Sequence, residues 1–491
     1  MKLKPFANDR GFASAALTVG VLAAVLSVSG CASFRLPTVT TAAIAAPAAW
    51  QAPAPHQGSA TDLTQWWSQF NDPLLPRLIA AAQEASPSVS AAKSRIEQSR
   101  AARVVAGAAL GPSLTAQGNA VRSAEGAASP VTSLTAGLNA GWEIDVFGGA
   151  AAGRDAAQAR LSGSEMLWHD ARVSVAAEVA TQYTFLRACE ATAAQVQLDA
   201  SSRSETARLT DLTAKAGFSA PAQAALSRAS AAQGNSQLTQ QRALCDGLVK
   251  GLVFLTGADE AALRTQLNTA RGVMAQPAQI SIPSVPAALL RQRPDLGNAE
   301  RELLAASSDI RQAQAAKLPR IALNGSIGAA RVSSSGPAGG FANSDSTWSL
   351  GPLSVSLPLF DGGSRTAQVS AAQARHTDAT LQYNAKLRAA VREVEDALIT
   401  LKSTADRNGD ALVATEGFAA SLRATDARYK GGLATLFELE DARRSAVQAQ
   451  TALIDLQRER VTAWITLYRA LGGGWSADAS ALALNDPTQR P

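Results

Sequence analysis

The sequence has few of the residues from which binding and catalytic sites are usually made. Aromatic residues are only 5% of the 491 residues, and there are three histidines, three cysteines and three methionines. The histidines (His56, His169 and His376) are scattered, so the sequence predicts no metal site. A methionine-lined metal route is equally unsupported. Phosphate-loop, serine-nucleophile and dinucleotide motifs are missing, so we expect neither an enzyme nor a cofactor.

Charge is sparse as well. Lys, Arg, Asp and Glu make up 17% of the residues and the net charge is +5. Part of that charge comes from Lys2, Lys4 and Arg10, close to the N-terminus. Because no basic run is interleaved with aromatic residues, the sequence does not predict nucleic-acid binding.

The N-terminal 30 residues have the pattern of a signal peptide. A basic start is followed by a small, apolar run over residues 12–30, too short for a membrane-spanning helix. The run ends in Val28-Ser-Gly-Cys31, which resembles a bacterial lipoprotein signal. That resemblance implies that Cys31 carries diacylglycerol and palmitate. An ordinary signal peptide with a chance cysteine is the alternative.

The residues after Cys31 bear on where such a lipoprotein would lie. Ala32 stands where an aspartate retains lipoproteins in the inner membrane, so the resemblance implies sorting to the outer membrane. Residues 31–62 are rich in Ala, Pro and Thr and are expected to form an extended tether.

Proline is missing between Pro358 and Pro487, and this stretch is rich in residues that favour helix. Its one strong break is Lys430-Gly-Gly-Leu433, where glycine suits the end of a helix. We therefore expect two antiparallel helices over about 362–430 and 433–471. The first would be roughly 100 Å long, which is unusual for a compact domain. Residues 476–491 are expected to be a loose tail.

Four segments alternate between apolar and polar residues, the pattern of a strand with one apolar face. They lie at about 113–123, 133–146, 320–332 and 346–360. Each pair of strands is preceded by shorter helices and followed by a long helix and a return helix.

The chain is a duplication. Gly217 and Gly432 are 215 residues apart, and Gly257 and Gly472 have the same separation. The first repeat covers 63–276, with long helices over about 150–216 and 220–257, and the second covers 277–475. The period is too long for a solenoid, so we interpret it as one duplicated unit.

The four strands cannot close a barrel by themselves, and open sheet edges are not tolerated in lipid. Three copies would supply twelve strands, an even number within the range of outer-membrane barrels. The long helices likewise show spacing close to coiled-coil seams. The sequence therefore predicts a mostly α-helical homotrimer with a membrane β-barrel. A soluble four-stranded fragment and an ordinary elongated coiled coil are the alternatives.

Four motifs support a family resemblance. They are Trp142-Glu-Ile-Asp-Val-Phe-Gly148, Leu289-Leu-Arg-Gln-Arg-Pro-Asp-Leu296, Leu357-Pro-Leu-Phe-Asp-Gly-Gly363 and Leu471-Gly-Gly-Gly-Trp475. Together they resemble the outer-membrane efflux proteins, and among them the lipid-anchored, NodT-like branch of the TolC superfamily. The resemblance implies a homotrimer with a twelve-stranded barrel in the outer membrane of a Gram-negative bacterium. An antiparallel α-helical coiled-coil barrel would extend through the periplasm.

The function implied by this resemblance is that of an exit duct in a tripartite efflux system. Small toxic compounds would pass from an inner-membrane pump of the RND or MFS type, through a periplasmic adaptor protein, to the exterior. A protein-secretion duct of the same superfamily is the main alternative. A structural coiled-coil or adhesin lipoprotein is a further one.

The resemblance also implies a gate at the periplasmic helix ends. Tyr429, Gly432, Glu438 and Asp441 match the tyrosine, glycine and acidic positions of the family motif. Glu438 and Asp441 are three residues apart and so share one helix face. In a trimer they would form two anionic rings that favour cations. The alternative is a solvated helix start, where acidic groups favour the helix dipole.

Two departures from the family pattern concern the lock of that gate. Ala434 replaces an arginine, and Gln223, close to the first-repeat tip at Gly217, replaces an acidic residue. A Tyr–Asp or arginine-based lock between the repeats is therefore not expected. The closed state should depend on helix packing and on the Glu438 and Asp441 rings.

Cys189 and Cys245 lie at equal distances on either side of Gly217, at similar heights on the first helical hairpin. In an oxidising periplasm they could form a disulfide. Two buried free thiols are an equally good interpretation of the sequence.

Overall fold

The computed structural model describes residues 66–67, 70–124, 130–274, 290, 292–334 and 345–473. The chain divides into two units, Met1–Ala43 and Ile44–Pro491, and all described residues belong to the second. The signal segment 1–30, Cys31, the tether 31–62, His56 and the tail 476–491 lie outside the described residues.

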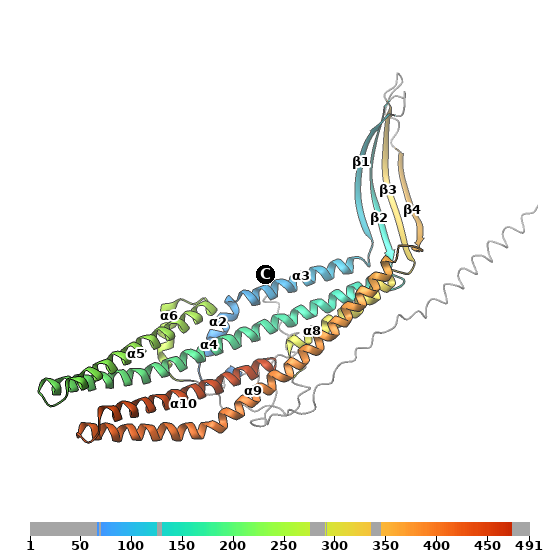
Figure 1. Ribbon diagram of the computed structural model, residues 1–491. Coiled ribbons are helices and arrows are strands. Elements are labelled where there is room, and N and C mark those ends of the chain that lie inside the picture. Colours follow the sequence, from blue (N-terminus) through green and yellow to red (C-terminus); the bar gives the residue numbers. More distant parts are fainter. Residues whose placement is uncertain are drawn as a thin grey trace, which may run out of the picture. The chain divides into compact units, whose positions relative to one another are not determined.

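The elements follow one another in this order (Figure 1): α2 (Leu74–Ala85), α3 (Pro87–Ala108), β1 (Ser113–Ser123), β2 (Val131–Ile144), α4 (Gly149–Lys215), α5 (Pro221–Thr256), α6 (Glu260–Leu267), the 3-10 helix η3 (Asn268–Ala270), α8 (Pro294–Ala315), β3 (Arg320–Ser334), β4 (Asp345–Ser356), α9 (Ser364–Lys430) and α10 (Leu436–Ala470).

The strands form one antiparallel sheet in the order β1-β2-β3-β4. Leu138 of β2 pairs with Ala116 of β1 and with Ile327 of β3. Directly paired residues point to the same side of a sheet, so these apolar side chains form one face. α3 leads into β1, and β2 leads into α4, so the sheet lies at one end of these helices (Figure 1).

Some element ends differ by a few residues from the sequence expectation. β2 ends at Ile144 and not at 146, because the N–H of Val146 turns back to the carbonyl of Ile144 at 2.9 Å. β4 ends at Ser356 and not at 360. Pro358 follows closely, and proline has no N–H to donate to a sheet.

The two long helices, α4 and α9, begin in the same way. Each contains 67 residues and follows a glycine with positive φ, Gly148 at 73° and Gly363 at 87°. The carboxylate of Asp145 accepts hydrogen bonds from the first free N–H groups of α4, and Asp361 does the same for α9. Free N–H groups at a helix start need such acceptors. This explains the aspartate and glycines in two of the four motifs.

The other two motifs meet each other within the second repeat. Arg293 is buried and donates to the carboxylates of Asp295 (2.8 and 2.9 Å) and Glu393 (2.8 Å), and to the carbonyl of Ala470 at 3.0 Å. Gly472 has φ of 85°, and a Cβ there would lie 2.5 Å from the carbonyl oxygen of Gln292. Glycine is therefore required at this close approach.

The acid–base state of Asp295 follows from this contact. Burial alone would raise its pKa, but hydrogen bonding to Arg293 and the charge of that guanidinium outweigh burial. The pKa of Asp295 lies below its ordinary value, so the carboxylate is charged at neutral pH.

One hydrophobic core joins the two repeats. Trp66 is fully buried and packs against Trp464 and Tyr468 of α10, with ring centroids 6.1 and 5.4 Å apart. The core also contains side chains from α2, α4, α5 and α9, among them Leu75, Leu186, Leu252, Val394 and Leu398. Because it draws on both helical hairpins, this core is shared by the two repeats.

Neither a membrane-spanning helix nor a metal cluster occurs among the described residues. No helix there has the length and apolar character needed to cross a membrane. No group of three or more His, Cys, Asp or Glu side chains there is placed to bind a metal ion.

Cys189 of α4 and Cys245 of α5 form a disulfide, with their Cα atoms 5.6 Å apart. The bond joins the two helices of the first hairpin and closes a loop between residues 56 apart in sequence. Of the two interpretations that the sequence leaves open, the structure contains the bonded one.

We expect peptide mapping of the protein, purified without reductant, to recover the Cys189 and Cys245 peptides joined. The Cys189→Ser/Cys245→Ser pair should lower the free energy of unfolding by about 2–4 kcal/mol, since a loop of this size is released in the unfolded chain. Thermal denaturation measures this loss. Recovery of both thiols in the free form would contradict the prediction.

Candidate gate at the helix tips

The second hairpin turns between α9 and α10. Gly432 takes φ of 73°, and the N–H of Leu433 donates to the carbonyl of Arg428 at 2.8 Å, which closes the end of α9. This is the arrangement that favours glycine after a helix. Thr435 then caps α10, so this helix begins at Leu436 and not at 433 as the sequence predicts.

The first hairpin turns between α4 and α5 in the same manner. Gly217 has φ of 81°, and the N–H of Phe218 donates to the carbonyl of Thr213 at 2.8 Å. Pro221 occupies the first position of α5, where its missing N–H costs nothing. Gln223 lies in that first turn and accepts a hydrogen bond from Ser219 at 3.3 Å.

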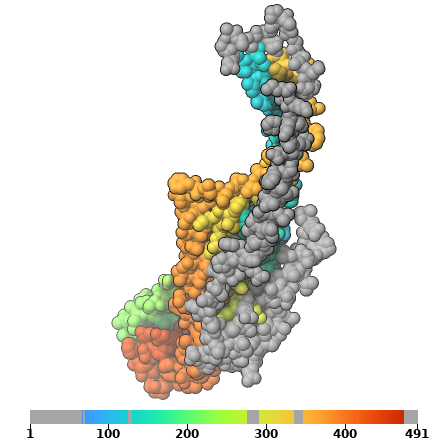
Figure 2. Space-filling model, turned by 90° about the vertical axis from the view of Figure 1, so that its right-hand side faces the viewer, coloured from blue at the N-terminus to red at the C-terminus, as the bar shows by residue number. Residues whose placement is uncertain are grey.

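The two hairpins lie side by side (Figures 1 and 2), and both of their turns lie at the end away from the sheet (Figure 1). A hydrogen bond of 3.2 Å joins the hydroxyl of Thr210 on α4 to that of Tyr429 on α9. Tyr429, which the sequence places at the gate, therefore contacts the first repeat.

A polar network joins α4 and α5 to α10 behind these tips. Arg203 of α4 donates to Asp199 of α4 (2.6 Å) and to Glu440 of α10 (2.8 Å). Ser230 of α5 also donates to Glu440 at 2.8 Å. We call this set, together with Arg443 and Thr206 described next, the inter-repeat network.

Arg443 of α10 is the most deeply buried arginine of the inter-repeat network, with 3% of its surface exposed. It donates to the hydroxyl of Thr206 on α4 at 2.7 Å and to Glu440 at 2.9 Å. Removing one member of a buried charge pair leaves the other uncompensated, which is costly. The network therefore holds the two repeats together at this level.

The inter-repeat network lies at other positions than the lock that the sequence analysis considers, so that expectation stays a prediction. Ala434 and Gln223 stand where the family pattern has an arginine and an acidic residue, so an arginine-based lock between the repeats is not expected at these positions. The structure contains such a contact at other positions, through Arg203 and Arg443. Comparing this sequence with the family position by position does not reveal these contacts. An arginine at another position of a facing helix can reach an acidic partner equally well.

Among the described residues, the inter-repeat network has two unpaired buried atoms. One carboxylate oxygen of Asp199 and Nε of Arg443 lack a hydrogen-bond partner there. Partly satisfied networks are less stabilising than complete ones. The inter-repeat network therefore stabilises the contact between the repeats less than a fully hydrogen-bonded network would.

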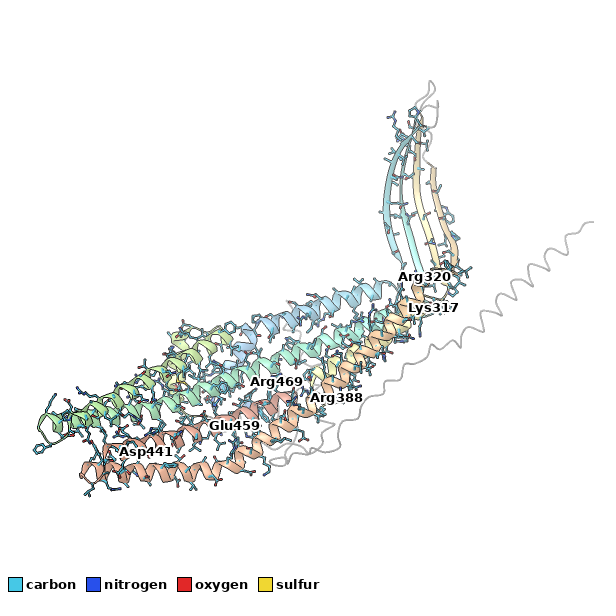
Figure 3. The ribbon with its side chains drawn as sticks, in the orientation of Figure 1. Lys317, Arg320, Arg388, Asp441, Glu459 and Arg469 are labelled. Atoms are coloured by element: carbon cyan, nitrogen blue, oxygen red, sulfur yellow. A yellow bond between two sulfur atoms is a disulfide. The ribbon has the colours of Figure 1, made fainter. Side chains whose placement is uncertain are left out.

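Glu438 and Asp441 are not equivalent in the structure. The carboxylate of Glu438 accepts from the N–H and hydroxyl of Thr435, at 2.6 and 2.9 Å, and completes a capping box. These hydrogen bonds, the backbone one foremost, lower the pKa of Glu438. Asp441 is exposed and pairs with Arg444 at 3.4 Å. Figure 3 shows Asp441 near the tip end of α10. Rings formed by either residue stay a prediction.

Three large apolar side chains are exposed at the tips, and sequence reasoning did not single them out. Phe218, Leu433 and Phe437 expose 88%, 73% and 71% of their surfaces. Their position beside the turn glycines is the only sequence signal that marks them. Apolar groups exposed together commonly mark a contact surface.

We expect breaking the inter-repeat network to loosen the tips. In Arg443→Gln, amide hydrogen exchange should speed up at the end of α4 and the start of α10. The missing charge-assisted hydrogen bonds correspond to about 1.5–3 kcal/mol. Arg444→Gln is the matched control, because Arg444 is the exposed neighbour on the same helix. Equal exchange in both variants would contradict the prediction.

Comparison with known proteins identifies the family. A model of the outer membrane efflux protein family matches residues 78–258 and 285–473. The chain is 32% identical to the outer membrane protein OprJ of Pseudomonas aeruginosa, over 94% of this chain and 97% of OprJ. It is 30% identical to the pyoverdine export outer membrane protein OpmQ of Pseudomonas putida, over 92% of this chain and 97% of OpmQ.

The fold is similar to that of solved channels. The CmeC outer membrane channel of Campylobacter jejuni superposes with a TM-score of 0.80 at 22% identity, over 93% of this chain and 99% of CmeC. The fold class and the family that the four motifs imply are thereby confirmed. The chain belongs to the outer membrane efflux protein family, and it is an efflux channel of the Gram-negative outer membrane.

Proposed function

We propose that three copies of this chain form a lipid-anchored exit duct for small toxic compounds. The duct works with a periplasmic adaptor and an inner-membrane pump of the RND or MFS type. The observation that carries the proposal is a four-stranded sheet with one apolar face, one polar face and two open edges.

The sheet edges support the trimer. Within the described part of the chain, β1 and β4 each have a neighbour on one side only. Apolar residues such as Leu114, Leu350 and Leu353 are exposed in the single chain. Lipid covers such residues, but it cannot supply hydrogen bonds to an open strand. Pairing β4 of one copy with β1 of the next, three times, gives a closed twelve-stranded barrel.

The opposite face of the sheet supports a water-filled passage. Asn139 of β2 pairs with Thr115 of β1 and with Ser326 of β3. Small hydroxyl and amide side chains continue along this face, including Ser113, Gln117, Thr135 and Asn324. Such a lining suits a lumen that passes varied solutes without binding them tightly.

The relatives support small-molecule cargo. OpmQ is named for pyoverdine export, which favours efflux of small compounds over the alternative of a protein-secretion duct. The anchoring proposal depends on the signal resemblance at Val28-Ser-Gly-Cys31. Acyl chains on Cys31 would add a second attachment beside the barrel, which makes membrane binding firm.

We place the gate of this duct at the helix tips. The contact of Tyr429 with Thr210 and the inter-repeat network hold the hairpins together. Asp441 is exposed and available to form an anionic ring in the trimer, whereas Glu438 is engaged in capping α10. The exposed Phe218, Leu433 and Phe437 provide an apolar surface for an adaptor. Opening requires that the contacts between repeats break.

Planar-bilayer recordings test the gate. Replacing Glu438 and Asp441 together by Ala should raise ion conductance, and Asp441→Asn alone should lower the preference for cations, because three carboxylates are removed from the entrance. Glu459→Gln is the control, an acidic residue on α10 further from the tip (Figure 3). Conductance and selectivity equal to those of the unmodified channel would contradict the assignment.

Complementation tests the duct. In a strain without its own exit ducts, expression together with the matching pump and adaptor should restore resistance to a panel of dyes, antibiotics and solvents. The purified protein should migrate as a heat-sensitive trimer, and mass spectrometry should find an acylated Cys31. A stable monomer in mild detergent would contradict the closure argument. A trimer with no effect on any compound would contradict the efflux role alone.

A further inference from the structure

We propose that Arg122 and Arg331 form a binding site for the phosphate groups of the phosphorylated glycolipid in the outer leaflet of the outer membrane. The site lies on the outward, apolar face of the sheet, at the end away from the helices. The inference rests on the proposed function only in that the strands cross this membrane with the helices in the periplasm.

The strand register places both arginines on the apolar face. Arg331 of β3 pairs with Leu134 of β2, and Leu134 pairs with Ala120 of β1. Arg122 is two residues beyond Ala120 and pairs with Thr132. Because side chains alternate along a strand and paired residues share a face, both guanidinium groups project on the side of Leu134 and Leu138.

Their depth matches the boundary of a membrane. Arg331 is ten residues from Ile321, where the apolar face begins on β3, which is about 33 Å along the strand. For a strand tilted by about 40°, this corresponds to roughly 25 Å of membrane, the usual height of the lipid-facing band. The arginines therefore lie at the lipid headgroups and not among the acyl chains.

The two side chains are close enough to act together. One strand separates β1 from β3, so their backbones are about 10 Å apart, and Arg122 lies one pair of residues, about 7 Å, beyond Arg331. Both side chains are exposed. Two long arginines at this spacing can reach phosphate groups on one headgroup, and the guanidinium fork suits bidentate contact with phosphate.

The distribution of charge points to a ligand on this side. Among the strand residues whose side chains the structure describes, the other charged residues are Glu143 and Arg320. Glu143 pairs with Ala322, which places it on the lumen face, and Arg320 lies two residues from Ala322 on that same face. The apolar face thus carries two positive charges, both at its outer end. An anionic lipid headgroup carries the opposite charge, and basic side chains near a membrane surface attract such headgroups.

Position selects the glycolipid over a phospholipid. The helices leave the sheet at its other end, next to Ser113 and Ile144. In the proposed duct that end faces the periplasm. The phosphates at the level of Arg122 and Arg331 are therefore those of the outer leaflet. In a Gram-negative outer membrane this leaflet is built from lipopolysaccharide.

The test uses the full-length trimer in detergent, with lipopolysaccharide and phosphatidylglycerol as the two probes. Lipopolysaccharide should raise the melting temperature of the unmodified trimer, and phosphatidylglycerol should raise it less. In Arg122→Gln/Arg331→Gln, the affinity for lipopolysaccharide should fall by about tenfold for each arginine replaced. Arg320→Gln is the matched control, since it removes an arginine from the same strand on the opposite face.

The Arg122→Lys/Arg331→Lys variant guards against a folding defect, because it keeps the charge and should retain part of the affinity. Unchanged lipopolysaccharide affinity in the double Gln variant would overturn the proposal. Equal stabilisation by lipopolysaccharide and phosphatidylglycerol through the same arginines would also overturn it, because the site would then bind any phosphate group. The double Gln variant should still form trimers and restore resistance. Failure of the unmodified protein in those two assays would instead count against the proposed function.

Discussion

One constraint governs the structure: every backbone N–H and C=O group within a membrane must form a hydrogen bond to another protein group. A sheet of four strands satisfies β2 and β3 on both sides but β1 and β4 on one side only. In lipid an unpaired strand edge is strongly unfavourable, and the opposite edge of a second copy can supply the missing donors and acceptors. In the proposed trimer the helices would share the symmetry of the barrel, because α3, α4, α8 and α9 connect directly to the strands.

Much of the fold follows from local rules. Alternation over about ten residues predicts the four strands, because an apolar face and a polar face leave a period of two in the sequence. The long helices follow from the absence of proline and from turn glycines such as Gly217 and Gly432, which have the positive φ that their position suggests. The duplication is visible because both hairpins turn by the same mechanism. Only element ends shift, where a cap such as Thr435 decides the boundary.

The candidate gate was less predictable than the fold. Sequence reasoning found Tyr429 but not its partner Thr210, and it placed Glu438 and Asp441 together although Glu438 is committed to the helix start. The inter-repeat network was missed entirely. Its contacts between the repeats join residues more than 200 apart in sequence, such as Arg203 and Glu440, which the packing of α4 against α10 brings together. Long-range polar pairs leave no periodic signal that a single sequence can reveal.

The equal length of α4 and α9 has a consequence for how this chain can change over generations. Each residue adds about 1.5 Å to a helix, so deleting one heptad from α4 alone would withdraw its tip by roughly 10 Å. Thr210 would then no longer lie opposite Tyr429, and Arg203 would no longer reach Glu440. Insertions and deletions in the two helices are therefore tolerated only in matched pairs. The side chains of the two repeats can diverge, but the lengths of their long helices must stay equal.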